Sequence, residues 1–190
     1  MQLRLKLPIS DAQYVSERGW ERAILEGCPF HPEGGCGLER LGTYGRVAPA
    51  GVRIARWWCP KQRASISLLP SFLAARLRGT LASVEDAVSA AERASSVAAA
   101  VDLVRPPDVE DAVGLVGAER WLRRRVAAVG AALRAIVTLM PERFAGVAPT
   151  LAAFREALSV GGVLVALREI AERHLPALPA PLGFRTRAAR

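Results

Sequence analysis

The chain has 190 residues, enough for one ordinary domain or two small ones, and its 51% of hydrophobic residues excludes wholesale disorder. Aromatic residues make up only 6%, and alanine is frequent from Leu73 onward, which favours packed helices over a β-sandwich. The formal net charge is +8, and all but two of the 26 basic residues are arginines. This bias suits a polyanionic partner, although a GC-rich genome would also produce it.

The first 27 residues predict a short strand over residues 3–7 and a helix over Asp11–Glu26. Asp11 is placed to cap this helix and Gly27 to end it. The N-terminal residues alternate charge with leucine and have no long apolar core, so they do not resemble a secretory signal. We therefore expect a cytoplasmic protein in which three cysteines stay reduced.

Residues 28–70 change in character, because Gly, Pro and Cys cluster there before short β-type runs. Strands are predicted at Thr43–Val47, Arg53–Trp58 and Ala64–Leu69, with a turn at Ala48–Gly51. Trp57 and Trp58 are adjacent on one of these strands and should point to opposite faces of the sheet.

From Ser71 onward the apolar residues recur at helical spacing, with Thr80 and Ser83 as candidate caps and prolines at 106 and 141 as stops. Helices are predicted near residues 84–91, 97–104, 122–140, 151–157 and 164–175. None of the apolar stretches is long and uninterrupted enough to span a bilayer, so no membrane is expected as a partner.

These elements predict an α+β protein, with a small three-stranded zinc ribbon followed by a mostly α-helical domain. The expected segments are an N-terminal strand and helix, the ribbon, a helical domain that resembles a helix-turn-helix, and an extended basic tail, at residues 1–27, 28–70, 71–176 and 177–190.

All three cysteines and one of the two histidines lie within 32 residues of each other, at Cys28, His31, Cys36 and Cys59. Three thiolates and an imidazole are a donor set that Zn²⁺ favours, and four protein ligands would make the ion structural. Gly34 and Gly35 would let the backbone fold back toward the site. The alternative is that the cysteines only fill core space. A ribbon this small has too little core to hold itself together, so we expect the ion to staple it.

The charges are segregated along the chain. Residues 37–78 carry eight basic residues and a single acid, Glu39, and residues 120–143 carry six arginines and one glutamate. Between them, residues 79–119 carry eight acids and two arginines. Two separated basic islands indicate two contact surfaces, or one surface assembled from both.

The acids between the two islands read as solvated helix faces and a helix-start cluster, and no catalytic carboxylate set is expected. Six of the eight acids carry this interpretation, namely Glu85, Asp86, Glu92, Asp108, Glu110 and Asp111.

Four motifs occur in order: Cys28-Pro-x-His31, Arg40-Leu-Gly-Thr-Tyr-Gly-Arg46, Val52-Arg-Ile-Ala-Arg-Trp-Trp-Cys59-Pro and Ser67-Leu-Leu-Pro70. Together they resemble the N-terminal zinc ribbon of bacterial insertion-sequence transposases and related helix-turn-helix proteins. The run Arg120-Trp-Leu-Arg-Arg-Arg125 resembles their recognition-helix region. A usual zinc ribbon would carry a second pair of the form Cys-x2-Cys, where this chain has Cys59-Pro-Lys-Gln62. The resemblance implies DNA contacts by Arg46, Arg53, Arg56, Arg123 and Arg124.

The basic helix beginning near Arg120 adds that residue to the candidate contacts, because its arginines lie off the apolar stripe. Trp121 is expected to anchor the helix in the core. The 106–117 gap before this helix is longer than a usual helix-turn-helix turn. A solvated arginine face on a bundle helix is the alternative interpretation.

The sequence therefore predicts a non-catalytic DNA-binding protein of the bacterial nucleoid, held by structural zinc and bound to double-stranded DNA. The alternative is a protein–protein interaction module, with the ribbon and the Ala-rich helices as docking surfaces. A homo-oligomer or a protein partner stays open. An enzyme is not expected, since no run of strands follows residue 70 to build a ribonuclease-H-like catalytic domain.

Overall fold

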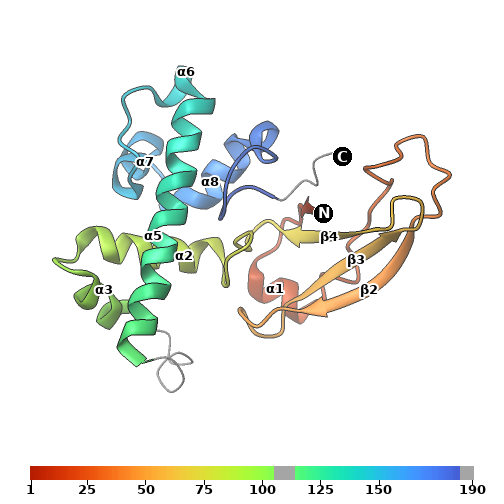
Figure 1. The fold of residues 1–190 in the computed structure, drawn as a ribbon, viewed down its shortest axis with the longest axis horizontal. Helices are drawn as coiled ribbons and strands as arrows, with labels where there is room; N and C mark the ends of the chain where they lie inside the picture. The colour runs from red at the N-terminus through yellow and green to blue at the C-terminus, as the bar shows by residue number, and fades with distance from the viewer. Residues whose placement is uncertain (105–113, 185–190) are drawn as a thin grey trace. The chain divides into compact units, whose positions relative to one another are not determined.

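The computed structural model describes residues 1–104 and 114–184. The chain divides into two compact units. Of the described residues, unit 1 comprises Met1–Leu73 together with Phe184, and unit 2 lies within Ala74–Gly183. Unit 1 contains the sheet and one short helix, and unit 2 contains helices (Figure 1). The α+β class is therefore confirmed.

Unit 1 is built on a four-stranded sheet with the strand order β1-β4-β3-β2. Its strands are β1 (Gln2–Leu5), β2 (Glu39–Gly45), β3 (Arg53–Cys59) and β4 (Ala64–Pro70). Three strands lie within residues 28–70 as expected, although β2 begins at Glu39 and ends at Gly45 instead of spanning Thr43–Val47. The expected three-stranded sheet is wrong. The N-terminal strand joins it by pairing in parallel with β4, and the Met1 amino group donates to the Ser65 carbonyl at 2.8 Å.

Pairing register assigns the side chains of this sheet to two faces. Trp57 pairs with Ile66 and Trp58 pairs with Ser65, so the two tryptophans lie on opposite faces, as expected. Trp57 is buried and Trp58 is half-buried. On β2 a register shift between Arg40 and Gly42 lets Arg40 pair with Trp57. Arg40 and Trp57 therefore share a face.

The helix after β1 is shorter than expected. Helix α1 spans only Asp11–Ser16, and its cap is Ser10, whose hydroxyl accepts from the Gln13 N–H, rather than Asp11. The chain leaves the helix through Arg18, which has a positive φ of 50°. Residue 19 must then pass directly over the buried Tyr14 ring, which leaves room only for glycine.

Replacing Gly19 by alanine is expected to destabilise unit 1 by about 1–3 kcal/mol, because the added methyl group overpacks a closed site. Its Cβ would lie 2.3 Å from Cδ2 of Tyr14, whose hydroxyl donates to the Arg53 carbonyl at the start of β3. Urea unfolding measures the loss. Gly27→Ala is the control, since a Cβ there meets nothing within 4 Å. Equal stability of the two variants would contradict the packing argument.

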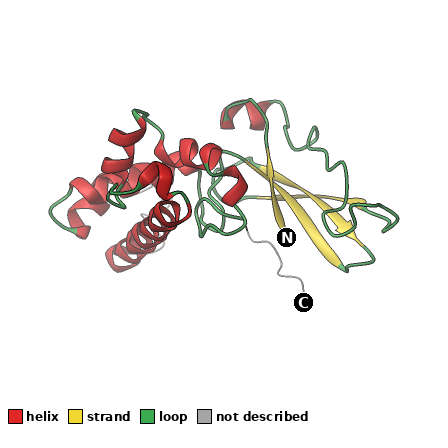
Figure 2. Cartoon of the chain, turned by 90° about the horizontal axis from the view of Figure 1, so that it is seen from above, coloured by secondary structure: helices red, strands yellow, loops and turns green. Residues whose placement is uncertain are grey.

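Among the described residues of unit 2, the named elements are all helices, joined by loops (Figure 2). Its helices are α2 (Leu81–Arg93), α3 (Val97–Val104), α5 (Gly114–Leu139), α6 (Pro141–Phe144), α7 (Leu151–Leu158) and α8 (Val163–Ile170), followed by a 3-10 turn at Glu172–His174. All five expected helices are present. Thr80 caps α2 reciprocally with Ser83. The long helix begins earlier than the sequence predicts, and Pro141 opens a further short helix.

The acids of α2 are not all solvated, which corrects the sequence analysis. Glu85 is only 4% exposed and accepts from the N–H groups of Val163 and Leu164, at the start of α8. Glu92, although exposed as a residue, accepts from the N–H groups of Leu151 and Ala152 at the start of α7. Both carboxylates satisfy helix N–H groups that would otherwise lack partners.

Asp86 alone of the described α2 acids is exposed and free of such a bond, whereas Asp108, Glu110 and Asp111 lie outside the described residues. At the end of unit 2, Leu178 and Leu182 are buried, so residues 177–183 pack onto the helical unit. Within residues 1–104 and 114–184, no helix combines the length and the hydrophobicity needed to cross a membrane.

Candidate metal centre

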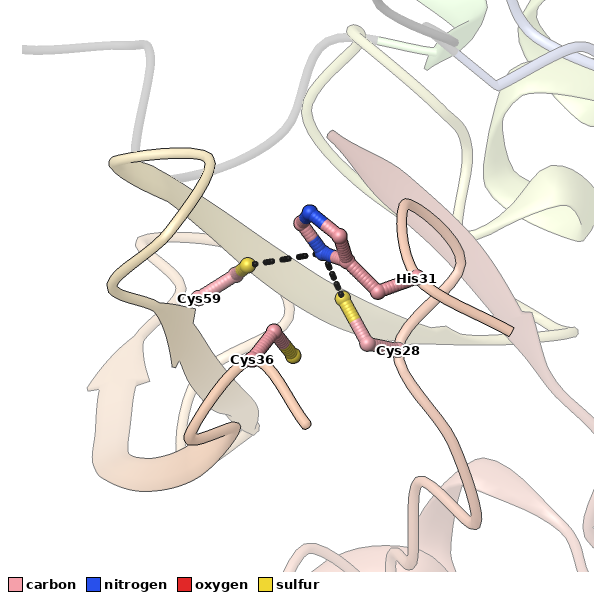
Figure 3. Close-up of side chains that lie close together, drawn as sticks. All are labelled: Cys28, His31, Cys36 and Cys59. Atoms are coloured by element: carbon pink, nitrogen blue, oxygen red, sulfur yellow. Dashed lines mark hydrogen bonds between the residues drawn. The ribbon is translucent and has the colours of Figure 1, made fainter. Parts of the chain in front are cut away.

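The structure brings the four expected metal ligands of unit 1 together (Figure 3). The three sulfur atoms and the His31 ligand nitrogen all lie within 4.8 Å of one another. Nδ1 of His31 is 3.6 Å from Sγ of Cys28 and 3.5 Å from Sγ of Cys59. A tetrahedral ion with bonds of about 2.3 Å to sulfur and 2.0–2.1 Å to nitrogen separates such ligands by about 3.5–3.8 Å. The cluster therefore has the dimensions of a metal site.

The segment between the first three ligands folds through tight turns. The N–H of His31 donates to the Cys28 carbonyl, and the N–H of Gly34 donates to the His31 carbonyl. Gly34 and Gly35 both have a positive φ, which turns the chain back so that Cys36 faces the other ligands. The role that the sequence suggested for these two glycines is confirmed.

Cys59 arrives from β3, whose pairing with β4 fixes its position. The turn that follows directs the backbone N–H of Gln62 to Sγ of Cys59, at 3.4 Å. Gln62 stands three residues after Cys59, at the position that a Cys-x2-Cys pair would fill with a second cysteine. It contributes a backbone donor to the bound sulfur, and such a bond stabilises a thiolate.

The pKa values of Cys28 and Cys36 are shifted in opposite directions. Burial raises the pKa of Cys28, but hydrogen bonds from His31, the Phe30 backbone, Cys36 and Cys59 together bring it down to about 7. Burial raises the pKa of Cys36, and its hydrogen bonds with Cys28 and Cys59 raise it further. A thiolate at Cys28 beside an imidazole is the form of these groups that binds a metal ion.

Such a set can hold an ion but offers it no open position. All three cysteines are buried and His31 is half-buried, so a four-coordinate ion would be enclosed by protein ligands. Sites of this composition are structural rather than catalytic. The ion would tie the 28–36 turns to the end of β3.

The predicted nucleic-acid contacts of unit 1 do not share one surface. Arg53 is exposed, and its Nε donates to Oγ1 of Thr43 at 2.8 Å. Arg56 is on the opposite face of β3, with its guanidinium carbon 5.7 Å from the centroid of the Tyr44 ring. Arg46 follows β2 and is half-buried, and its burial lowers its pKa.

The predicted contacts of unit 2 lie on α5. Arg120 and Arg124 are exposed, whereas Arg123 forms an ion pair with Glu119 at 2.9 Å. Because α5 begins at Gly114, these arginines lie in its second and third turns, farther from the helix start than the sequence indicated. Three residues connect α2 to α3, whereas most of the 106–117 connection between α3 and α5, on which the expected helix-turn-helix depends, lies outside the described residues.

Sequence reasoning missed Arg125 on the same helix. Its guanidinium carbon is 3.8 Å from the centroid of the Trp121 ring, and it donates to the carbonyls of Arg78 and Trp121. Burial, together with the nearby charges of Arg124 and Arg78, lowers its pKa to about 10. The i,i+4 spacing of Trp121 and Arg125 was the available signal. Trp121 is half-buried against the α2, α3 and α5 core, as expected.

The chain was compared with models of protein families, with curated proteins and with solved structures, and none of these comparisons found a match.

Proposed function

We propose that this chain is a zinc-stabilised protein that binds DNA without catalysing a reaction on it. The observation that carries the proposal is the set of arginines presented by the sheet next to the cysteine cluster. Within the described part of the chain, Arg40 and Arg53, which share one face of the sheet, have no carboxylate partner, so their positive charge is available to a polyanion.

Zinc is the ion that the donor set favours. Three thiolates and an imidazole select a soft or borderline cation, and separations near 3.5 Å suit tetrahedral geometry. With all four positions taken by protein, the ion would supply folding energy rather than an activated water. This supports a binding role instead of catalysis.

The helix α5 supports the proposal from unit 2. Arg120 and Arg124 are exposed and have no carboxylate partner among the described residues, and the charges of Arg78 and Arg124 both act on Arg125. Such a group of guanidinium ions is suited to backbone phosphates, whereas Arg123 is partly neutralised by Glu119. We assign Arg120 and Arg124 as the stronger contacts of this helix.

Titration of the full chain with a 20-base-pair duplex at several salt concentrations tests the proposal. If about three phosphates are neutralised, the logarithm of the affinity should fall with the logarithm of salt with a slope of about −3. That slope corresponds to a loss of roughly fiftyfold between 50 and 200 mM salt. Fluorescence anisotropy of a labelled duplex provides the measurement. Absent binding, or binding that does not weaken with salt, would overturn the DNA-binding proposal and favour the protein-interaction alternative.

A further inference from the structure

A second feature of unit 1 is an open pocket of about 530 Å³, separate from the cysteine cluster. It is lined by Arg18, Trp20 and Glu21 from the turn after α1, by Arg40 and Thr43 on β2, and by Arg53 on β3. This volume lies within the range of small-ligand sites, roughly 300–1,000 Å³.

The sheet register explains why these residues meet. Arg40 pairs with Trp57 and Thr43 pairs with Ala55, so both side chains are on the face of β3 that also carries Arg53. Arg56 pairs with Gly42 and projects from the other face together with Tyr44, which pairs with Ile54. The pocket is therefore a property of one face of the sheet only.

The wall of the pocket is held in place by hydrogen bonds. Arg40 donates to the carbonyl of Trp20 at 2.6 Å and to that of Glu21 at 3.4 Å, which fastens the turn to the edge strand. The Arg40 guanidinium carbon is 5.5 Å from the centroid of the Trp57 ring. Arg53 is oriented through Nε by Thr43, and its two terminal nitrogens have no partner among the described residues. A guanidinium fixed in this way loses little freedom when it binds a ligand.

The charge of the pocket selects an anion. Three guanidinium groups face one carboxylate, Glu21, which is 3.6 Å from Arg18 in an exposed pair. An exposed pair of this kind is weak, so an incoming anion can compete for Arg18. The planar forks of Arg53 and Arg18 match the oxygen atoms of a phosphate, and Trp20 adds a half-buried aromatic side chain beside them.

We propose that this pocket binds a phosphodiester group of a nucleic-acid backbone, with Arg53 and Arg18 as the phosphate ligands and Arg40 as the residue that positions the wall. The inference rests on the proposed DNA binding and adds which face of the sheet the nucleic acid contacts. The nucleic acid lies against the face with Arg53, and Arg56 on the opposite face makes no contact with it.

Two substitutions on the same strand test the inference in the full chain. Arg53→Gln and Arg56→Gln remove the same charge from opposite faces, so they are matched. Each phosphate contact makes the affinity about eightfold higher at 0.1 M salt than at 1 M salt. Arg53→Gln is expected to weaken binding of the 20-base-pair duplex about eightfold at 0.1 M salt and to reduce the salt slope by about one. Arg56→Gln should change the affinity less than about twofold, and Arg53→Lys should recover part of the loss.

Each result decides a different point. Suppose that the wild-type chain binds the duplex. If Arg53→Gln then binds it equally well, or if Arg56→Gln loses as much affinity as Arg53→Gln, the assignment of the phosphate site to this pocket is wrong, while the DNA-binding proposal stands. If the wild-type chain does not bind the duplex, both proposals fall. An NMR titration with inorganic phosphate distinguishes a nucleic-acid backbone from a free phosphate ion as the ligand. If phosphate alone shifts the Trp20 indole signal while the duplex does not bind, the pocket binds a small anion and the nucleic-acid assignment is overturned. Circular dichroism and metal content of the variants confirm that they fold.

Discussion

Replacing Cys59 by serine is expected to abolish metal binding and to unfold the sheet-bearing unit at moderate temperature. Native mass spectrometry should show one zinc ion on the wild-type chain and none on the variant. Structural zinc contributes about 10–16 kcal/mol of apparent binding free energy in small zinc domains, so losing one of four ligands should remove at least 2 kcal/mol of stability. A loss of 2 kcal/mol lowers the melting temperature of a domain of this size by about 10 °C.

The two histidines of the chain provide a matched control. His31→Asn should lose the ion as Cys59→Ser does, because His31 lies 3.5 Å from the Cys59 sulfur. His174→Asn should keep it, since His174 is in unit 2 and its nearest polar partner is Arg173. Removing the ion from the wild-type chain with a chelator should lower the melting temperature as far as Cys59→Ser does. Full zinc occupancy in Cys59→Ser would contradict the ligand set.

Replacing Glu85 by alanine is expected to cost about 3 kcal/mol of the stability of unit 2. The change leaves the buried N–H groups of Val163 and Leu164 without acceptors. It also removes the carboxylate partner of Arg155, whose Nη2 lies 3.0 Å from Oε1 of Glu85, and leaves Arg155 its hydrogen bond to the Ser89 hydroxyl. Because the Arg155 side chain is 38% exposed, its pair contributes less than the two amides. Urea unfolding followed by far-ultraviolet circular dichroism measures the loss.

Substitutions of two other acids on the same helix provide a comparison for the stability loss of Glu85→Ala. Asp86→Ala, one residue away and exposed, should change stability by less than about 0.5 kcal/mol. Glu92→Ala should fall between them, at about 1 kcal/mol, because Glu92 accepts from the first N–H groups of α7 but is more exposed. Equal losses for Glu85→Ala and Asp86→Ala would show that the buried bonds contribute nothing.

The sequence predicted the elements whose signals are local. The strands around Arg53 and Ala64 and the apolar stripe from Leu122 are confirmed, since alternation and helical spacing can be read from neighbouring residues. The strand near residue 3 was also anticipated, but its parallel pairing with β4 joins residues more than sixty positions apart. Such pairing depends on tertiary packing, and the pattern of neighbouring residues carries no information about it. The predicted helix Asp11–Glu26 is longer than the observed α1, because the close approach of residue 19 to Tyr14 cannot be inferred from the sequence either.

The candidate site divides in the same way. The metal ligands were predictable because thiolates and imidazole at short spacing have few other uses, and the structure places all four together. The pocket of Arg18, Arg40 and Arg53 was not predictable, since it needs the register shift in β2 and the turn after α1. The buried role of Glu85 was missed because a glutamate on an amphipathic helix is usually solvated, and its partners lie nearly eighty residues away.

The two acceptor carboxylates of α2 make this helix the common support for the beginnings of α7 and α8. Glu85 and Glu92 are two turns apart, so they lie along one side of α2. Neither α7 nor α8 can then separate from α2 without breaking hydrogen bonds to the carboxylates of a helix that is itself part of the core. We expect the amide protons of Leu151, Val163 and Leu164 to exchange with solvent at a common, slow rate, as members of one cooperative foldon rather than as independent fraying ends.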